Sequence, residues 1–134
     1  MISLTEVTHP DDIPWVVRTL RERTSWGSWL TEEQIRGALK NSLCVWAHEF
    51  DGTDSNPVGF LRAVTDKHAF SSITDVWVEP HWRKRGVGSL LVERALSHPD
   101  IKPTICILGT RDAAGFYAKF GFGPVEVPVL QRDP

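Results

Sequence analysis

The pattern of hydrophobic and polar residues divides the first part of the chain into a strand and two helices. Apolar and polar residues alternate over Ile2–Val7, which predicts a short strand. A helix is predicted from Pro14, which fits a first helical turn, to about Arg23. Thr31–Gln34 reads T-E-E-Q, a capping-box sequence that predicts the start of a second helix, ending near Asn41.

Three strands are predicted in the middle of the chain. Leu43–Phe50 and Val58–Val64 are apolar runs joined by a polar loop, which predicts a hairpin. Ile73–Val78 is rich in β-branched and aromatic residues and predicts the third of these strands, which Pro80 ends.

The second half of the chain alternates between helix and strand patterns. The predicted elements are a helix from Gly86 to before Pro99, a buried strand at Thr104–Leu108, a short helix at Ala113–Phe120 ended by Gly121, and one or two short strands within Phe122–Leu130. This order predicts an α/β fold of the mixed α+β kind, with a mixed central sheet and helices on both faces. Because the 134 residues fall below the roughly 150 of a typical domain, we expect a single domain over residues 1–134.

Composition and charge narrow the classes of function. Hydrophobic residues make up 41% of the chain and charged residues 24%, which is typical of a globular protein and argues against disorder. The net charge of −2 provides no basic field for a nucleic-acid partner. The two halves differ, since residues 1–66 carry a net charge of −4 and residues 67–134 a net charge of +2. An anion site is therefore expected in the second half.

Membrane, secreted and metal-binding classes are also disfavoured. No uncharged stretch exceeds eight residues, whereas a membrane helix needs about 20 apolar residues, so we expect no membrane partner. The N-terminus lacks the basic start and apolar run of a secretory signal, and a cytoplasmic location is expected. The five histidines form no H-x-x-x-H pair and no cluster with Cys44 or Cys106, so we expect no metal site.

The turn after the third strand of this middle group has the chemistry of an anion site. Arg83, Lys84 and Arg85 precede Gly86 and Gly88, and a predicted helix begins at this point. The first N–H groups of a helix lack intrahelical partners, and the helix dipole adds positive charge there. Glycines let a ligand approach the backbone closely. A pyrophosphate is the natural ligand of such a site.

The spacing of the glycines excludes two common phosphate-binding motifs. Leu91 stands where the dinucleotide fingerprint G-x-G-x-x-G needs its third glycine, and the sequence G-x-x-x-x-G-K-S/T is absent. Arg83, Gly86 and Gly88 instead form the pattern R-x-x-G-x-G. The alternative is that Arg83–Arg85 is a solvated turn that the glycines merely shape. The position of the motif between a strand and an amphipathic helix favours the anion site.

Three segments carry a resemblance to a known family. Val76–Leu91 reads V-W-V-E-P-H-W-R-K-R-G-V-G-S-L-L, Ala113–Phe122 reads A-A-G-F-Y-A-K-F-G-F, and Val58–Asp66 reads V-G-F-L-R-A-V-T-D. The first resembles motif A of the GNAT N-acetyltransferases, V-x-P-x-x-Q/R-x-x-G-x-G/A. The second resembles that family's alanine–tyrosine–G-F signature, and the third is similar to a segment of small single-domain members. The resemblance implies the GNAT acyltransferase fold and acetyl-CoA as co-substrate.

The same resemblance implies roles for residues around the basic turn. The acetyl-CoA pyrophosphate would be held by Lys84 and by backbone N–H groups of Arg85, Gly86, Val87, Gly88 and Ser89. Arg83 stands at the family's glutamine-or-arginine position. The pantetheine arm would pair with the backbone of Val76, Trp77 and Val78. An N–H group in that strand could polarise the thioester carbonyl.

Tyr117 stands at the family's general-acid position, where it would protonate the departing CoA thiolate. The alternative is that its ring packs against the sheet, and both roles are compatible. The family often has an asparagine at the position of Thr110, and either Thr110 or Asp112 could take its place.

Asp75, Trp26 and Trp29 are candidates for the acceptor side. Asp75 could accept the proton of the amine, bind a cationic acceptor, or form a structural ion pair with an arginine. Trp26 and Trp29 lie between the first two helices, in the segment that lines the acceptor pocket of the family's fold. Packing of this loop onto the sheet is the alternative. With Asp75 nearby, the two indoles would suit a cationic or aromatic amine.

The combined prediction is an acetyl-CoA-dependent N-acetyltransferase in which a primary amine attacks the thioester directly, with Tyr117 as general acid. Neither Cys44 nor Cys106 lies beside a histidine in the sequence, so a covalent acyl-enzyme has no support. The acceptor would be a small-molecule amine or a peptide or protein amine, and the chain a monomer or homodimer. The alternative is a non-catalytic acyl-CoA-binding or regulatory module on the same fold.

Overall fold

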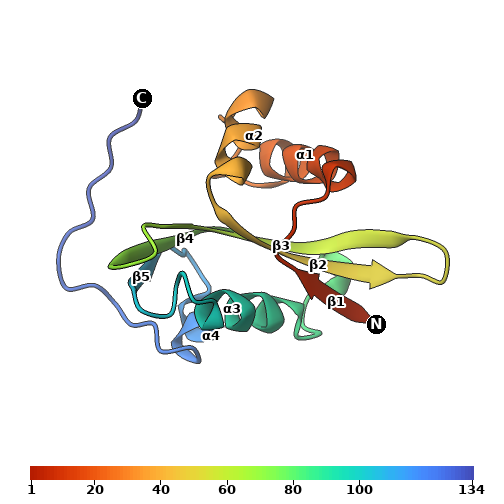
Figure 1. Ribbon diagram of the computed structural model, residues 1–134. Helices are drawn as coiled ribbons and strands as arrows, with labels where there is room; N and C mark the ends of the chain where they lie inside the picture. Colours follow the sequence, from red (N-terminus) through yellow and green to blue (C-terminus); the bar gives the residue numbers. More distant parts are fainter.

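Five strands form one sheet in which each strand lies beside its neighbour in the sequence, as seen in the computed structural model of residues 1–134 (Figure 1). The first four strands pair in antiparallel fashion, and the last pair is parallel. The strands are β1 (Ile2–Thr5), β2 (Leu43–Phe50), β3 (Ser55–Thr65), β4 (Phe70–Val78) and β5 (Ile105–Leu108). β3 and β4 each begin three residues earlier than predicted, because residues 55–57 pair with β2 and residues 70–72 pair with β5.

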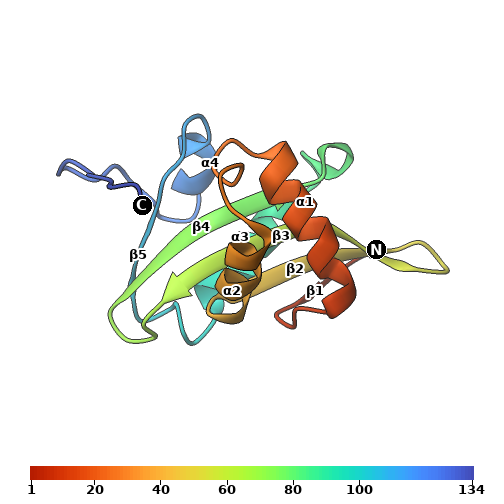
Figure 2. The ribbon, with the colours of Figure 1, turned by 90° about the horizontal axis from the view of Figure 1, so that it is seen from above.

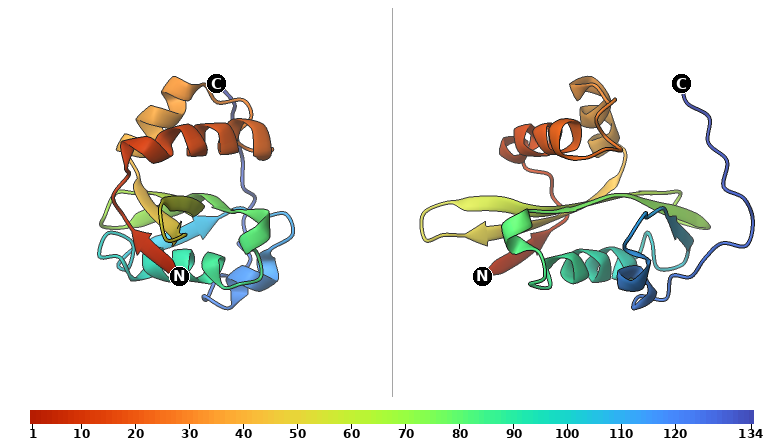
Figure 3. Two further views of the ribbon diagram at one scale, coloured as in Figure 1. Left: turned by 90° about the vertical axis from the view of Figure 1, so that its right-hand side faces the viewer. Right: turned by 180° about the vertical axis from the view of Figure 1, so that it is seen from behind.

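Helices cover both faces of the sheet (Figures 1 and 3). One layer holds α1 (Ile13–Arg23) and α2 (Glu32–Lys40), and the other holds α3 (Val87–Ser97) and α4 (Ala114–Ala118). Two short 3-10 turns, η1 (Pro10–Asp12) and η2 (Pro80–Trp82), precede α1 and α3. The predicted mixed sheet with helices on both faces is confirmed. None of the helices has the length and apolar character needed to span a bilayer.

Two apolar cores join these layers to the sheet. The core beneath α1 and α2 centres on Trp46 and Phe60, whose ring centroids are 4.6 Å apart. The core beneath α3 contains Leu61 and Leu91, which are fully buried. Gly59 lets α3 approach β3, because a Cβ atom there would lie 3.2 Å from Leu91 Cδ1. The first turn of α3 is thereby held tightly against the sheet.

A β-bulge in β4 changes the direction of its side chains. Arg62 pairs with Asp75 and Ala63 with Ile73, so Thr74 is an extra residue in β4. Ile73 packs in the α3 core, whereas Asp75, two residues later, contacts the loop after α1. Without the bulge, the two-residue period of a strand would put both side chains on one face.

β4 and β5 pair over only part of their length. Their parallel register joins Phe70–Ile73 to Ile105–Leu108 and ends there (Figure 2). The remainder of β4, Thr74–Val78, has no neighbour on that side, and its backbone groups on that edge are available to a ligand.

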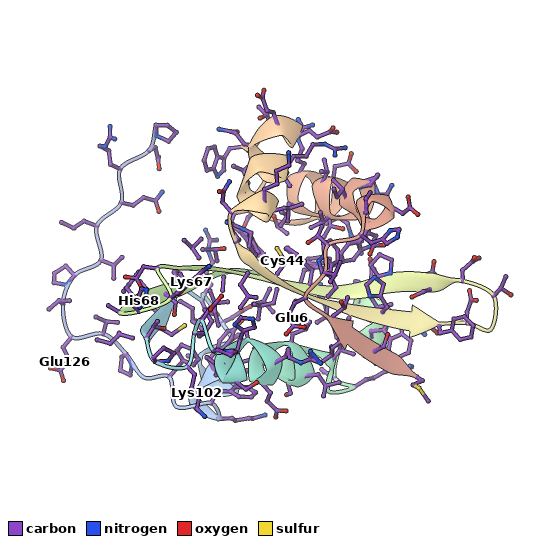
Figure 4. All side chains as sticks on the ribbon, viewed as in Figure 1. Glu6, Cys44, Lys67, His68, Lys102 and Glu126 are labelled. Atoms are coloured by element: carbon purple, nitrogen blue, oxygen red, sulfur yellow. The ribbon has the colours of Figure 1, made fainter.

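The prediction of one or two strands within Phe122–Leu130 is wrong. This segment follows α4 as an extended tail without strand pairing, and it leaves the body of the molecule (Figure 1). Figure 4 shows Glu126 on this tail, away from the sheet. Pro124 and Pro128 supply the physical reason, because proline has no N–H group to donate to a ladder.

Candidate active site

The N-terminus of α3 presents unpaired backbone donors. Lys84 and Gly86 both have positive φ angles, of 62° and 84°, so the turn curls sharply before the helix. No side chain caps α3, and Leu90 N–H, which donates to Gly86 O at 3.1 Å, makes the first backbone bond. The N–H groups of the three preceding residues therefore point out of the helix end, where the dipole is positive. The predicted placement of this turn between β4 and α3 is confirmed.

Gly86 and Gly88 are glycines for different reasons. The φ of 84° at Gly86 is a conformation that side chains disfavour. At Gly88, a Cβ atom would make only ordinary contacts, 3.5 Å from Phe116 Cζ and 3.9 Å from Val78 Cγ2. The fold itself thus tolerates a methyl group at position 88. These contacts also show that the first turn of α3, the end of β4 and α4 meet at one place.

The free edge of β4 lies beside this helix end. Glu79 N–H donates to Val58 O of β3 at 2.8 Å, so Glu79 turns its backbone groups towards β3. Because these directions alternate along a strand, Val78 and Val76 turn theirs to the free edge. The Val78 carbonyl accepts a bond from Arg83 Nε at 2.9 Å. Val78 N–H and both backbone groups of Val76 are the ones that the edge offers to a ligand.

Tyr117 lies in α4, against the same core as Val76 and Val78. Its ring makes edge contacts with Phe116 and Phe122, with centroids 5.0 and 6.0 Å apart. Burial raises the pKa of the Tyr117 phenol, because the charged form would lose hydration. The phenol therefore keeps its proton at neutral and moderately alkaline pH.

Thr110 holds the start of α4. Its hydroxyl accepts a hydrogen bond from Ala113 N–H at 3.0 Å. Of the two residues considered for the family's asparagine position, Thr110 is the one with a structural role visible here.

Two of the three basic residues of the turn lie over tryptophan rings. Arg83 lies over the Trp77 ring, with its guanidinium carbon 4.7 Å from the ring centroid, and Arg85 lies 5.1 Å from the Trp82 centroid. Trp77 is also covered by Arg23 of α1, at 4.9 Å. The Arg83 side chain thus lies on the α1 side of β4, whereas the free N–H groups lie at the end of α3.

Asp75 is buried, with 4% of the residue exposed, and each of its oxygens accepts a short hydrogen bond. Oδ1 accepts from Trp26 Nε1 at 2.8 Å, and Oδ2 accepts from Arg62 Nε at 2.6 Å. Of the three alternatives for Asp75, the structure contains the arginine ion pair. The geometry offers no support for Asp75 as the proton acceptor or as the site of a cationic acceptor, because both oxygens are engaged.

Trp26 and Trp29 lie together in the loop between α1 and α2. They are 46% and 59% exposed, and Trp29 Nε1 donates to Trp26 O at 2.9 Å. Gly27 makes this loop tight, since a Cβ atom there would lie 2.7 Å from Leu20 O. The loop is held to the sheet, as the packing alternative required, yet both indoles keep an exposed face.

A second ion pair lies at the end of β4. Glu79 accepts hydrogen bonds from Arg23 Nη1 at 2.7 Å and Nη2 at 2.6 Å, and from Trp15 Nε1 at 3.0 Å. Its bonds with Arg23 hold the pKa of Glu79 below its usual range. Asp75 and Glu79, the two carboxylates that point from β4 and its end towards α1, are therefore both paired with arginines.

Comparison with known proteins identifies the family. The Acetyltransferase (GNAT) domain family matches residues 40–124, which is more than half of the chain. The chain belongs to the GNAT acetyltransferase family. The predicted resemblance is confirmed, and so is the fold class.

Individual relatives of this GNAT chain agree. An acetyltransferase of the GNAT family from Xanthomonas campestris pv. campestris is 30% identical, with a TM-score of 0.88 over 100% of this chain and 94% of that one. A GNAT family acetyltransferase from Streptococcus pneumoniae TIGR4 is 26% identical, with a TM-score of 0.69 over 99% and 98%. An uncharacterized N-acetyltransferase, ycf52, from Pyropia yezoensis is 28% identical over 84% of this chain. The GNAT chain spans 59% of the length of that relative.

Arg23, Arg62 and Glu79 of this GNAT site were not identified from the sequence alone. Arg62 and Arg23 neutralise Asp75 and Glu79, and Trp77 lies between Arg23 and Arg83. A signal for Arg62 was present, because it is the one charged residue in the apolar run Val58–Val64. A charge at such a position is expected to have a buried partner.

Proposed function

We propose that this chain is an acetyl-CoA-dependent N-acetyltransferase that transfers an acetyl group to a primary amine by direct attack. The observation that carries the proposal is the meeting of three features at one place. These are the uncapped N-terminus of α3, the unpaired edge of β4 and helix α4, which carries Tyr117. Family membership supports an acyl-CoA as donor.

The residues of the turn fit a pyrophosphate. The N–H groups of Val87, Gly88 and Ser89 face out of the helix end, and those of Arg85 and Gly86 precede them in the same turn. Lys84 adds positive charge there. Since the fold does not require a glycine at position 88, the missing side chain leaves room for an anion to approach the backbone. Arg83 is proposed to close the turn through its bond to Val78 O.

The β4 edge fits an extended amide-containing arm. Backbone groups of Val76 and Val78 would pair with that arm as a neighbouring strand does, and Trp77 would lie on the opposite, α1 side. Acetyl-CoA, when bound, supplies the activated acetyl thioester. An N–H group of this edge would donate to the thioester oxygen and stabilise the charge that develops on it.

Tyr117 is proposed as the general acid. The nitrogen–carbon bond would form as the carbon–sulfur bond breaks, and the leaving sulfur would take the phenolic proton. The proton lost by the acylated nitrogen would pass through water and restore the phenol. A covalent route through Cys44 is disfavoured, because burial raises the pKa of that thiol to about 11. Figure 4 shows Cys44 between β2 and the helices above it, remote from α4.

The acceptor is proposed to lie on the α1 side of β4, against the exposed faces of Trp26 and Trp29. Because Asp75 and Glu79 are both paired with arginines, the indoles rather than a free carboxylate would select the amine. A small-molecule amine and a peptide or protein amine both fit an open surface of this kind. The alternative function is a non-catalytic acyl-CoA-binding module.

The proposal is tested by measuring CoA binding and acetyl transfer on the same preparation. Calorimetry with CoA should show a one-to-one complex, and a thiol-release assay with acetyl-CoA should detect turnover with at least one member of an amine panel. CoA binding without acetyl transfer to any amine of the panel would favour the non-catalytic module. Absence of CoA binding would refute both.

A further inference from the structure

We infer that Asp75 is a positioning residue that holds the acceptor-side loop, Thr24–Leu30, in place through the indole of Trp26, with Arg62 fixing its carboxylate. The inference rests on the proposed function for its kinetic consequences, since it concerns the acceptor side of that reaction. Its structural part stands on the hydrogen bonds alone.

The first step is the bulge at Thr74. It turns Asp75 away from the α3 core and towards the loop after α1. The carboxylate is thereby buried on the same side of β4 as Trp77, two residues further along the strand. A buried carboxylate needs donors, and Trp26 and Arg62 supply them.

The second step is the rigidity of Arg62. Its Nε donates to Asp75 Oδ2 at 2.6 Å, and its Nη1 donates to Ser42 Oγ at 3.1 Å. The guanidinium is thus held between β4 and the start of β2. Because one side of the carboxylate is fixed in this way, the other oxygen presents a fixed acceptor to the indole.

The third step is how the loop is otherwise attached. The hydrogen bonds of residues 25–30 run within the loop or to Thr24, with one exception. The exception is Trp26 Nε1 to Asp75 Oδ1, which joins the loop to the sheet. Trp29 in turn donates its indole N–H to Trp26 O. The two exposed indoles therefore share one hydrogen bond to the sheet, which Asp75 accepts.

This role differs from that of a general base in what it predicts. A base contributes to the pH dependence of kcat, and its loss lowers kcat at saturating amine. A positioning residue that orders the acceptor loop changes the KM for the amine, and it leaves donor binding unchanged. Trp26→Phe separates the two roles, because it removes the indole N–H and retains the Asp75–Arg62 pair.

The first experiment is hydrogen exchange of the full chain, with no ligand required. Trp26→Phe and Asp75→Asn should speed amide exchange in residues 25–30 by about tenfold, the factor that corresponds to losing one hydrogen bond to a charged group. In Trp26→Phe, which retains the Asp75–Arg62 pair, exchange in β2 and β3 should be unchanged. Trp15→Phe is the matched control, because it removes another indole–carboxylate bond, of 3.0 Å, from α1 to Glu79. Exchange in residues 25–30 should stay at the parent rate in that variant.

The second experiment is steady-state kinetics with an amine found active in the panel. Trp26→Phe should raise the KM for the amine by about 3- to 30-fold, with kcat and the Kd for acetyl-CoA within about twofold of the parent. Asp75→Asn should keep the pH profile of the parent. Unchanged loop exchange in Trp26→Phe would overturn the inference. A pH profile that loses a limb in Asp75→Asn would overturn it too, by making Asp75 a proton acceptor. If the chain fails to bind CoA, the proposed function falls, while the exchange measurement still decides the role of Asp75.

Discussion

The two sides of β4 are built in opposite ways. On the α3 side, the candidate donor site consists mainly of backbone groups, which are the N–H groups at the start of α3 and the unpaired edge at Val76–Val78. On the α1 side, the candidate acceptor site consists of side chains, with Trp26 and Trp77 set among two arginine–carboxylate pairs. A backbone site suits a ligand that never changes, whereas a side-chain site can vary without altering the fold. This contrast explains why family membership indicates the donor and leaves the acceptor open.

The contrast is tested most severely at Gly88, where a carboxylate would enter the backbone site. Gly88→Glu should weaken CoA binding by about 100-fold or more, because negative charge would meet the pyrophosphate at the helix end. Gly37→Glu is the matched control, since Gly37 lies on α2 and a Cβ atom there would have nothing within 4 Å. Calorimetry should give a parent-like Kd for the control. Parent-like CoA binding by Gly88→Glu would remove the anion site from this turn.

Tyr117→Phe tests whether the donor side also performs chemistry. We expect kcat to fall by about 10- to 1,000-fold while the Kd for acetyl-CoA stays within about threefold, because a general acid acts in the transition state. Rapid-mixing measurements of a single turnover would report the chemical step directly. A variant with parent-like single-turnover rates would restrict Tyr117 to packing against Phe116 and Phe122.

The pH dependence sharpens the same assignment. Because burial raises the pKa of Tyr117, the acid form persists above the usual phenol value of about 10 and is lost only as the pH rises through the raised value. The chemical step should therefore show no decline from phenol ionisation between pH 7 and 9. A declining limb in that range that is present in the parent and absent in Tyr117→Phe would contradict this expectation.

Glu79→Gln tests whether the side-chain side contributes to stability and not to donor binding. The substitution should lower the free energy of unfolding by about 1 kcal/mol at pH 7, a modest value because the pair with Arg23 is partly exposed. The lowered pKa of Glu79 means that its contribution exists above the ordinary carboxyl pKa and disappears as the pH falls through the lowered one. Urea unfolding should therefore show a smaller difference between variant and parent at pH 3 than at pH 7, with equal CoA affinity at pH 7.

The smallest expected effect tests whether position 88 must be glycine for CoA binding or for folding. Gly88→Ala should weaken CoA binding by about 3- to 10-fold, while the unfolding free energy stays equal or rises, since alanine is the better helix former. Gly37→Ala should show the stability change alone. A Gly88→Ala variant that loses stability would indicate that the contacts with Phe116 and Val78 are tighter than the 3.5 and 3.9 Å separations imply.

The sequence predicted the backbone side well because its residues are contiguous. The strand end, the turn at Arg83–Arg85 and the helix start lie in one run, and the positive φ at Gly86 follows from the motif. Gly121 was likewise predicted to end a short helix, and its φ of 91° fits that place.

The side-chain side could not be predicted because its partners come from segments far apart in the chain. Arg62 and Asp75 are 13 residues apart, and Trp26 lies 49 residues before Asp75. The alternation of apolar and polar residues does not reveal a bulge such as that at Thr74. The face of the sheet on which the Asp75 side chain lies could therefore not be predicted. The strands predicted in the tail are absent for a different reason, since Pro124 and Pro128 lack the N–H groups that a ladder needs.

The extra residue at Thr74 makes β4 tolerant of a change in length at that one position. Thr74 is exposed, so its replacement by another residue that suits a strand should cost little. Its deletion would make Asp75 follow Ile73 directly, and regular alternation would keep the Asp75 carboxylate on the α1 side and Val76 in the core under α3. A single-codon deletion at Thr74 should therefore still give a folded chain, and the substitution library at the same codon should be broadly tolerated.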